Sequence, residues 1–201
     1  GVQGVGAATV GDSLAALDTL VFRTGQVTLD ELLEAASLFL KCPLPSGEGI
    51  GLLSLSGGQI GLVADLAQDL GLTFPPFSPE AERALEGILP PYSTIANPLD
   101  AWGSGDLEKS YPACVDVVAR DEDVHLVAMT RDTPPEVARR EVEQSLAVAD
   151  AAVKAKVETG KPVLMFSNLS TGFQPEVERR LDEGGVPYLQ GTRETLRSMQ
   201  A

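Results

Sequence analysis

From residue 50 onwards, short continuous apolar runs alternate with stretches whose apolar residues recur at helical spacing. The runs that we predict as strands are residues 50–55, 72–74, 124–129, 163–167 and 186–189. The stretches that we predict as helices are residues 58–70, 79–89, 107–120, 134–159, 175–183 and 192–199. Strands that are apolar throughout are typical of parallel sheets buried on both faces. The alternation therefore predicts a three-layer α/β fold, with a mostly parallel sheet and helices on both faces.

The first 45 residues follow another pattern, and we interpret them as the tail of a preceding domain and a linker. Two helices are expected between residues 12 and 40, and Thr28 with Glu31 three positions later has the form of a capping box for the second. The Pro- and Gly-rich segment 42–49 favours a boundary, so that a flavodoxin-like α/β domain would span residues 46–201. The chain has no initiator Met, which suggests a piece of a longer polypeptide.

Charge restricts the partners that such a domain can bind. Fifteen Lys and Arg residues against 29 Asp and Glu residues give a formal net charge of -14. A field of this sign repels the phosphate backbone of nucleic acids and the surface of anionic membranes, so neither partner is expected. An anionic ligand would have to be held by local groups, such as the backbone N–H groups at the start of a helix.

Cysteine and histidine are too scarce for a zinc or redox centre. Cys42 and Cys114 lie far apart in sequence, and His125 is the only histidine. We therefore expect no metal site, two reduced thiols and a buried, hydrogen-bonded structural role for His125. No apolar run approaches the roughly 18 residues of a membrane span, and no signal peptide is evident, so a cytoplasmic protein is expected.

The turn Ser56-Gly57-Gly58 is the first candidate site, because it leads from a predicted strand directly into a predicted helix. Ligands of open α/β sheets bind at the carboxyl ends of strands, where glycines let a phosphate approach the first N–H groups of a helix. Two interpretations remain open: an anion site, and a tight turn in which the glycines only relieve backbone strain. The turn matches neither a Walker loop nor Gly-x-Gly-x-x-Gly, so direct ATP binding is not expected.

Two further segments are candidate ligand or interdomain loops. In the first, Asn97 precedes a proline and projects its amide from an extended backbone, Asp100 can cap a turn or accept a ligand's hydrogen bond, and Trp102 can stack or pack. In the second, Arg131 and Asn168 follow two predicted strands, and Arg131 can hold an anion or pair with Asp132. For both segments an ordinary structural loop is the favoured interpretation.

Two motifs together resemble a known family. The motif Ser54-x-Ser56-Gly57-Gly58 with Asp65, followed by Asn97-Pro98-Leu99-Asp100, is similar to the second succinyl-CoA synthetase-like domain of the NDP-forming acyl-CoA synthetases. That family includes succinyl-CoA synthetase and ADP-forming acetyl-CoA synthetase. The order of the later segments also fits, with Lys161-Pro162-Val163 and Gly185-Val186-Pro187-Tyr188 each entering a predicted strand. The resemblance covers about residues 46–201.

The resemblance implies an acid–CoA ligase that joins a carboxylic acid to CoA at the expense of ATP. In such an enzyme the helix after Ser56-Gly57-Gly58 points its positive end at a phosphoryl group. CoA-binding and ATP-grasp domains, on the parent chain or on separate subunits, would bind CoA, ATP and Mg²⁺. We therefore expect no cofactor in this chain, no turnover by the chain alone, and a small carboxylic acid as substrate. A homo-oligomer is compatible with these expectations.

One departure from the family's pattern favours a different reading. The preceding domain of the family carries a histidine that becomes phosphorylated, and here its place falls on Ser13 or Leu14. A non-catalytic binding or scaffold module that has lost the phosphohistidine relay is therefore the alternative. A stand-alone receiver-like domain is a third reading, but the acidic cluster at residues 121–123 precedes its strand instead of following it.

Overall fold

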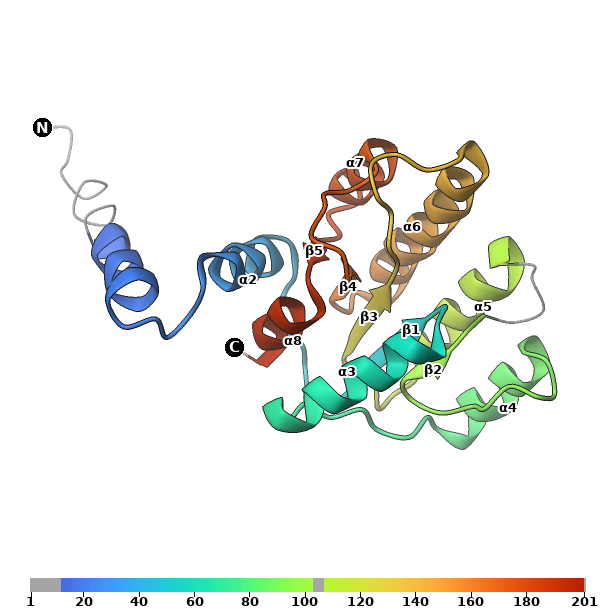
Figure 1. Ribbon diagram of the computed structural model, residues 1–201. Coiled ribbons are helices and arrows are strands. Elements are labelled where there is room, and N and C mark those ends of the chain that lie inside the picture. Colours follow the sequence, from blue (N-terminus) through green and yellow to red (C-terminus); the bar gives the residue numbers. More distant parts are fainter. Residues whose placement is uncertain (1–11, 103–106, 201) are drawn as a thin grey trace, which may run out of the picture.

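The computed structural model describes residues 12–102 and 107–200 (Figure 1). Its described part contains one sheet of five parallel strands in the order β2-β1-β3-β4-β5. The strands are β1 (Ile50–Ser54), β2 (Leu99–Asp100), β3 (Leu126–Thr130), β4 (Val163–Ser167) and β5 (Tyr188–Gln190). The strand order reverses between β1 and β3, which is the topological switch point of a flavodoxin-like sheet. The predicted fold class is confirmed.

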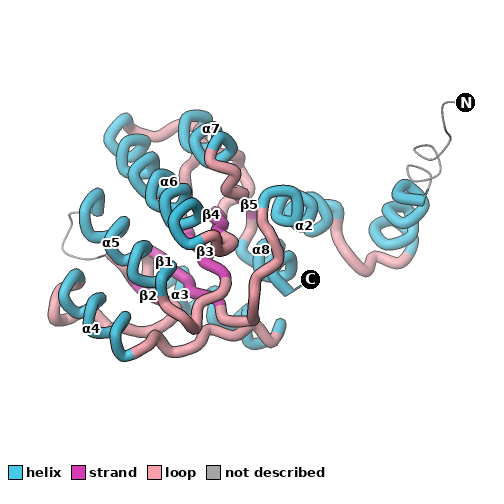
Figure 2. The backbone as a smooth tube through the Cα atoms, turned by 180° about the vertical axis from the view of Figure 1, so that it is seen from behind, coloured by secondary structure: helices cyan, strands magenta, loops and turns pink. Residues whose placement is uncertain are grey.

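Helices cover both faces of the sheet (Figures 1 and 2). Successive residues of a strand point to opposite faces, so neighbours in one strand enter different cores. Leu53 and Met165 lie in the core beneath one helical layer, whereas Leu52 and Phe166 lie in the other. The first layer comprises α4 (Pro79–Ile88), α5 (Leu107–Arg120), α6 (Arg139–Thr159) and α7 (Pro175–Glu183). The second comprises α2 (Leu29–Lys41), α3 (Gly57–Leu70) and α8 (Thr192–Gln200).

Helix α2 packs on the α/β domain although a linker separates the two in sequence. Leu38 is buried in the same core as Leu52, and Glu31 forms an ion pair with Arg197 of α8. The capping box at the start of α2 is present as predicted. The domain boundary at residue 45 stays a prediction, and in space it would divide a continuous core.

The edge of the sheet next to β1 differs from the prediction. Residues 72–74, predicted as a strand, form only an isolated bridge between Thr73 and Gly49. The edge strand is β2, which comes from a segment predicted as a loop. The two pairings take up opposite ends of β1, because Thr73 pairs near its start and Leu99 pairs with Leu53 near its end.

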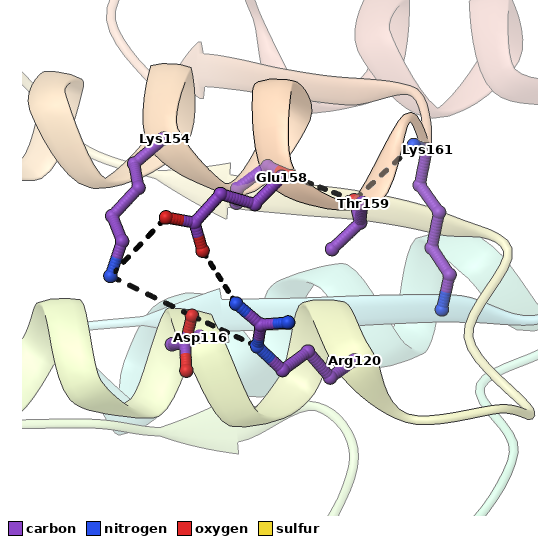
Figure 3. Close-up of polar contacts among 7 residues, drawn as sticks. Asp116, Arg120, Lys154, Glu158, Thr159 and Lys161 are labelled. Carbon is purple, nitrogen blue, oxygen red and sulfur yellow. Dashed lines mark hydrogen bonds and ion pairs between the residues drawn. The ribbon is translucent and has the colours of Figure 1, made fainter.

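A surface network of charges joins α5 to α6 (Figure 3). Asp116 and Glu158 alternate with Arg120 and Lys154, and the Lys154 Nζ lies 3.8 Å from Asp116 and 3.9 Å from Glu158. All four side chains are substantially exposed, so solvent screens the network and each pair contributes little to stability. The buried apolar residues of the two helices hold the layer together.

Candidate functional site at the carboxyl ends of the strands

The start of α3 presents unused backbone donors at the carboxyl end of β1. Ser56 is the N-cap residue, with extended backbone angles (φ -149°, ψ 117°), and Gly57 and Gly58 are exposed. The first bond of the helix runs from the Ile60 N–H to the Ser56 carbonyl (3.2 Å). Among the described residues, no acceptor is found for the N–H groups of Gly57, Gly58 and Gln59. This end of α3 therefore offers three donors and the positive end of the helix dipole.

A hydrogen-bond network fixes the first turn of α3 to the neighbouring strands. The Gln59 Oε1 accepts from the hydroxyl groups of Ser54 (2.9 Å) and Thr130 (2.7 Å). The Gln59 Nε2 donates to the Asp132 Oδ2 (3.1 Å), and the Ser56 N–H donates to the Ser54 Oγ (3.1 Å). Ser54 and Thr130 are buried, so the network ties α3 to β1 and β3 at the switch point.

The same network continues along the edge of the sheet. The Asp132 Oδ1 accepts from the Ser167 hydroxyl and from the Asn168 N–H, both at 2.8 Å. The Asn168 Oδ1 accepts in turn from the Thr192 hydroxyl at the start of α8. The predicted candidate Asn168 thus belongs to a chain of polar contacts that connects the ends of β1, β3, β4 and β5.

Asn97 has a structural role in the described fold. Its amide Oδ1 accepts from the Leu52 N–H (3.1 Å), and its Nδ2 donates to the carbonyls of Ile50 (2.7 Å) and Pro75 (2.9 Å). These contacts lie along β1 between the pairings made by Thr73 and β2, where the side chain takes the place of a strand backbone. Both the oxygen and the nitrogen of the Asn97 amide are therefore bonded to the main chain of the described fold. The peptide bond between Asn97 and Pro98 is cis.

Asp100 lies beside the open end of α3. A Cβ atom built on Gly57 would lie 3.3 Å from the Asp100 Oδ2, while the Asp100 Oδ1 accepts from the Trp102 N–H (3.2 Å). The carboxylate thus closes a local turn and also faces the positive end of a helix. Trp102 is 56% exposed, and its role as an interdomain contact stays a prediction.

Arg131 does not pair with Asp132. Its Nε donates to the Ser145 Oγ on α6 (3.1 Å), and its carbonyl accepts from the Tyr188 hydroxyl. Burial raises the pKa of the Tyr111 phenol, an effect that the nearby guanidinium of Arg131 partly offsets. Arg131 therefore lies on the α5–α6 side of the strand ends, whereas the Gln59 network lies on the α3 side.

The remaining titratable candidates do not contribute to this site. His125 is half-buried instead of buried, and its Nδ1 lies 3.3 Å from the Ser46 Oγ, at the amino end of β3. Burial raises the pKa of the Cys114 thiol to about 12 and also raises that of Cys42, so both thiols are protonated at neutral pH. Within the described residues, no group of three or more His, Cys, Asp and Glu side chains forms a metal site.

The two residues predicted to take the place of the family's histidine lie on an exposed segment. Residues 12–17 are helical and lead into η1 (Asp18–Arg23), which buries no residue. Ser13 is exposed and Leu14 is 61% exposed. In Figures 1 and 2 this segment stands away from the sheet, beyond α2.

Sequence comparison relates this chain to enzymes that form CoA thioesters. No known family model matches it. Over 192 residues it is 27% identical to a trans-feruloyl-CoA synthase from an unknown prokaryotic organism, covering 92% of this chain and 26% of the relative. Over 161 residues it is 28% identical to the alpha subunit of acetate–CoA ligase (ADP-forming) II from Pyrococcus furiosus, covering 80% and 34%. The chain is thus similar in sequence to CoA ligases, one of them ADP-forming. It spans about a quarter to a third of the length of these two relatives.

Solved structures show the same fold. PH0766 from Pyrococcus horikoshii superposes with a TM-score of 0.73 at 21% identity, covering 98% of this chain and 43% of that one. A dinucleotide-forming acetyl-coenzyme A synthetase 1 from Ca. Korarchaeum cryptofilum, in complex with phosphate and ADP, gives 0.63 at 19% identity and covers 95% and 40%. At these identities the two likenesses show a shared fold. In the described residues no helix is both long and apolar enough to cross a membrane.

Sequence reasoning found the glycine turn but missed Gln59 and Thr130. Both residues stand next to predicted features, since Gln59 follows the glycines and Thr130 ends an apolar strand. A polar residue at the end of an otherwise apolar strand, and a glutamine three positions after a serine, are the signals that would have pointed to them.

Proposed function

We propose that this chain is part of an NDP-forming acyl-CoA synthetase that joins a carboxylic acid to CoA at the expense of ATP. Its contribution is a phosphate-binding helix start at Ser56, Gly57 and Gly58, together with an interdomain surface that includes Trp102. The relatives named above support the class of reaction. CoA, ATP and Mg²⁺ are assigned mainly to other domains or subunits, as the family resemblance implies.

The observation that carries this proposal is the set of unused N–H groups at the start of α3. Two of them lie on the exposed glycines Gly57 and Gly58 and the third on half-buried Gln59, at the carboxyl end of an inner strand and next to the switch point where open α/β sheets bind ligands. Donors fixed in place by secondary structure bind an anion without the cost of ordering side chains. Because the chain carries a formal net charge of -14, such local donors are the kind of anion site it can use.

The test compares a substitution at the start of α3, at Gly58, with one three residues further along the same helix, at Gly61. A Cβ at Gly58 meets only the Ser56 Oγ, at 3.7 Å, and a Cβ at Gly61 meets nothing within 4 Å. Each glycine therefore has room for a Cβ atom, but only Gly58→Val adds a branched side chain at one of the residues whose N–H group is unused. We expect Gly58→Val to abolish CoA ligation by the full-length protein without unfolding it, and Gly61→Val to retain it.

The readout is a ligation assay across aliphatic and aromatic acids in which ADP and AMP are resolved. Circular dichroism of both variants establishes that they are folded. Unchanged turnover in Gly58→Val would remove the site assignment.

A non-catalytic binding module is the second candidate. It is favoured by the position of the family's phosphorylated histidine, which falls here on Ser13 or Leu14, neither of which can replace an imidazole in a phosphoryl relay. The ligation assay and a phosphate titration together separate the two functions, because a binding module gives no ligation with any acid but still binds phosphate.

A further inference from the structure

Helix α2 has two faces that differ in their contacts. Its buried residues, Glu31 and Leu38, face the α/β domain, where Glu31 pairs with Arg197 of α8 and Leu38 enters the core of the second layer. In Figures 1 and 2 the helix lies at the edge of that domain, next to α8. The opposite face carries four exposed apolar residues, which we name the α2 seam: Leu29, Leu33, Ala36 and Leu40.

The spacing of the α2 seam is that of a helix–helix interface. Steps of four, three and four residues match the alternation of apolar positions in a coiled coil. The described part of the chain leaves this stripe open to solvent. Leu33 is 57% exposed, and Leu40, at 85%, is more exposed than any other large apolar side chain of the described residues. A continuous apolar stripe on the surface marks an interaction site.

We propose that the α2 seam is a homodimer interface, in which it packs antiparallel against the α2 seam of a second copy of this chain. The seam fits a copy of itself about a two-fold axis that passes between Leu33 and Ala36. Leu29 of one copy then faces Leu40 of the other, and Leu33 faces the small Ala36, which lets the two helices approach closely. Self-complementarity of this kind is what a two-fold interface requires. The inference goes beyond the proposed ligase function and does not depend on it.

Charge favours both the second copy and the antiparallel direction. Each copy has a formal net charge of -14, so two copies approach most easily on a surface without charged residues, and the α2 seam contains none. The first turn of α2 carries Asp30, and the last turn carries Lys41. An antiparallel pair brings the acidic end of each helix to the basic end of the other and opposes the two helix dipoles. A parallel pair would place the two Asp30 carboxylates side by side.

Exposed apolar residues continue beyond both ends of the α2 seam. Phe39 and Leu44 border an apolar groove of about 400 Å³ that Met199 also lines. The segment before α2 exposes Leu20 and Phe22. In an antiparallel pair, that segment of one copy lies at the same end as the groove of the other. Burial of these residues adds to the apolar area of the interface, and a lasting dimer needs more area than one short seam provides.

Sedimentation velocity of the 201-residue chain over a range of concentrations tests for the dimer. We expect the parent chain to form a dimer that dissociates on dilution. Leu33→Glu should weaken this dimer about 100-fold or more, because it brings two carboxylates into the apolar centre of the seam. Leu62→Glu is the matched control, since Leu62 is 46% exposed but lies on α3, and it should leave the dimer unchanged. Circular dichroism of both variants establishes that they are folded.

Cysteine cross-linking tests the direction of the pair. Chains with Leu29→Cys and chains with Leu40→Cys, both in a Cys42→Ser background, are oxidised separately and as a mixture. The antiparallel arrangement predicts an intermolecular disulfide only in the mixture, because position 29 faces position 40, while the two positions 29 of a pair lie about 16 Å apart. A parallel arrangement predicts a disulfide in each variant alone. Cys114 is buried and does not compete.

Three results would overturn the inference: a parent chain that stays monomeric at high concentration, a Leu33→Glu dimer as strong as that of the parent, or disulfides in the separate Leu29→Cys and Leu40→Cys chains. The first result would mean that another segment or another protein covers the α2 seam. None of the three affects the ligation assay, so failure of the dimer and failure of the proposed function are told apart.

Discussion

The Lys156 ammonium of α6 donates a hydrogen bond to the main-chain carbonyl of Lys41, the last residue of α2, over 3.2 Å. It also donates to the carbonyl of Gly185 in the turn before β5. A positive charge at this place satisfies carbonyl groups at the end of a helix and is attracted to its dipole. Since α2 and α6 belong to different layers, Lys156 joins the two layers at one end of the sheet.

Substitution of Lys156 by Met should therefore loosen α2. We expect Lys156→Met to lower the free energy of unfolding by about 1–3 kcal/mol, because it removes hydrogen bonds from a charged group and leaves half-buried carbonyls unpaired. Lys154→Met is the matched control on the same helix, and its exposed ion pairs (Figure 3) predict a loss of about 0–1 kcal/mol. Urea denaturation measures both, and equal losses would contradict the assigned role of Lys156.

The capping box of α2 gives a second prediction. Thr28→Ala removes the hydroxyl that accepts from the Glu31 N–H, and it should cost about 1 kcal/mol of stability. Thr28→Ser keeps the acceptor and should cost much less. Because α2 covers one face of the sheet, the loss should appear in the main unfolding transition; a separate, earlier transition of α2 would show that it does not fold together with the domain.

Local sequence predicted those elements whose ends carry strong signals. Helix α7 begins at Pro175 and ends before Gly184, and β4 is apolar from Val163 onwards; both were predicted with the bounds that the structure has. Helix α6 was predicted from residue 134 but begins at Arg139, since the two prolines at the start of that stretch lie before the helix.

What local sequence could not predict depends on partners that are distant along the chain. Residues 72–74 have the composition of a strand, yet the Asn97 side chain occupies the β1 edge beyond their single bridge. The open start of α3 follows a similar rule. A serine and a glutamine three residues apart favour a capping box, but the Gln59 side chain bonds instead to Thr130 and Asp132, which lie more than 70 residues further along the chain.

Glu34 predicts a pH dependence of stability. Burial raises the pKa of its carboxyl, as do Asp30 and Glu194 nearby, while a hydrogen bond from the Gln190 N–H opposes the rise. A carboxyl whose pKa is higher in the folded than in the unfolded state destabilises the fold when it is ionised. This loss of stability begins as pH rises through the unfolded pKa and is complete above the folded pKa.

Glu34→Gln should therefore stabilise the protein at pH 7 and leave its stability unchanged at pH values below the unfolded pKa of glutamate, since Gln can accept the same hydrogen bond. Thermal unfolding of both proteins across this pH range gives the comparison, with exposed Glu183→Gln as control. A stabilisation that persists undiminished at low pH would show that the carboxylate charge is not its cause.

Asp100 offers a test of charge at the open end of α3, where its Oδ2 lies beside Gly57. Asp100→Asn can still accept from the Trp102 N–H, so the local turn is kept while one negative charge is lost. Two charges about 5 Å apart in a solvated site interact with about 0.5–1 kcal/mol, which predicts phosphate binding about two- to fivefold tighter, with a difference that shrinks as salt is added.

Asp116→Asn, which neutralises a carboxylate on the outer surface of α5, should leave the affinity unchanged. The measurement is the phosphate titration of the 201-residue chain at two salt concentrations. Equal affinities of the parent and Asp100→Asn at low salt would mean that phosphate does not bind next to Gly57, and the anion site would have to be sought elsewhere along the strand ends.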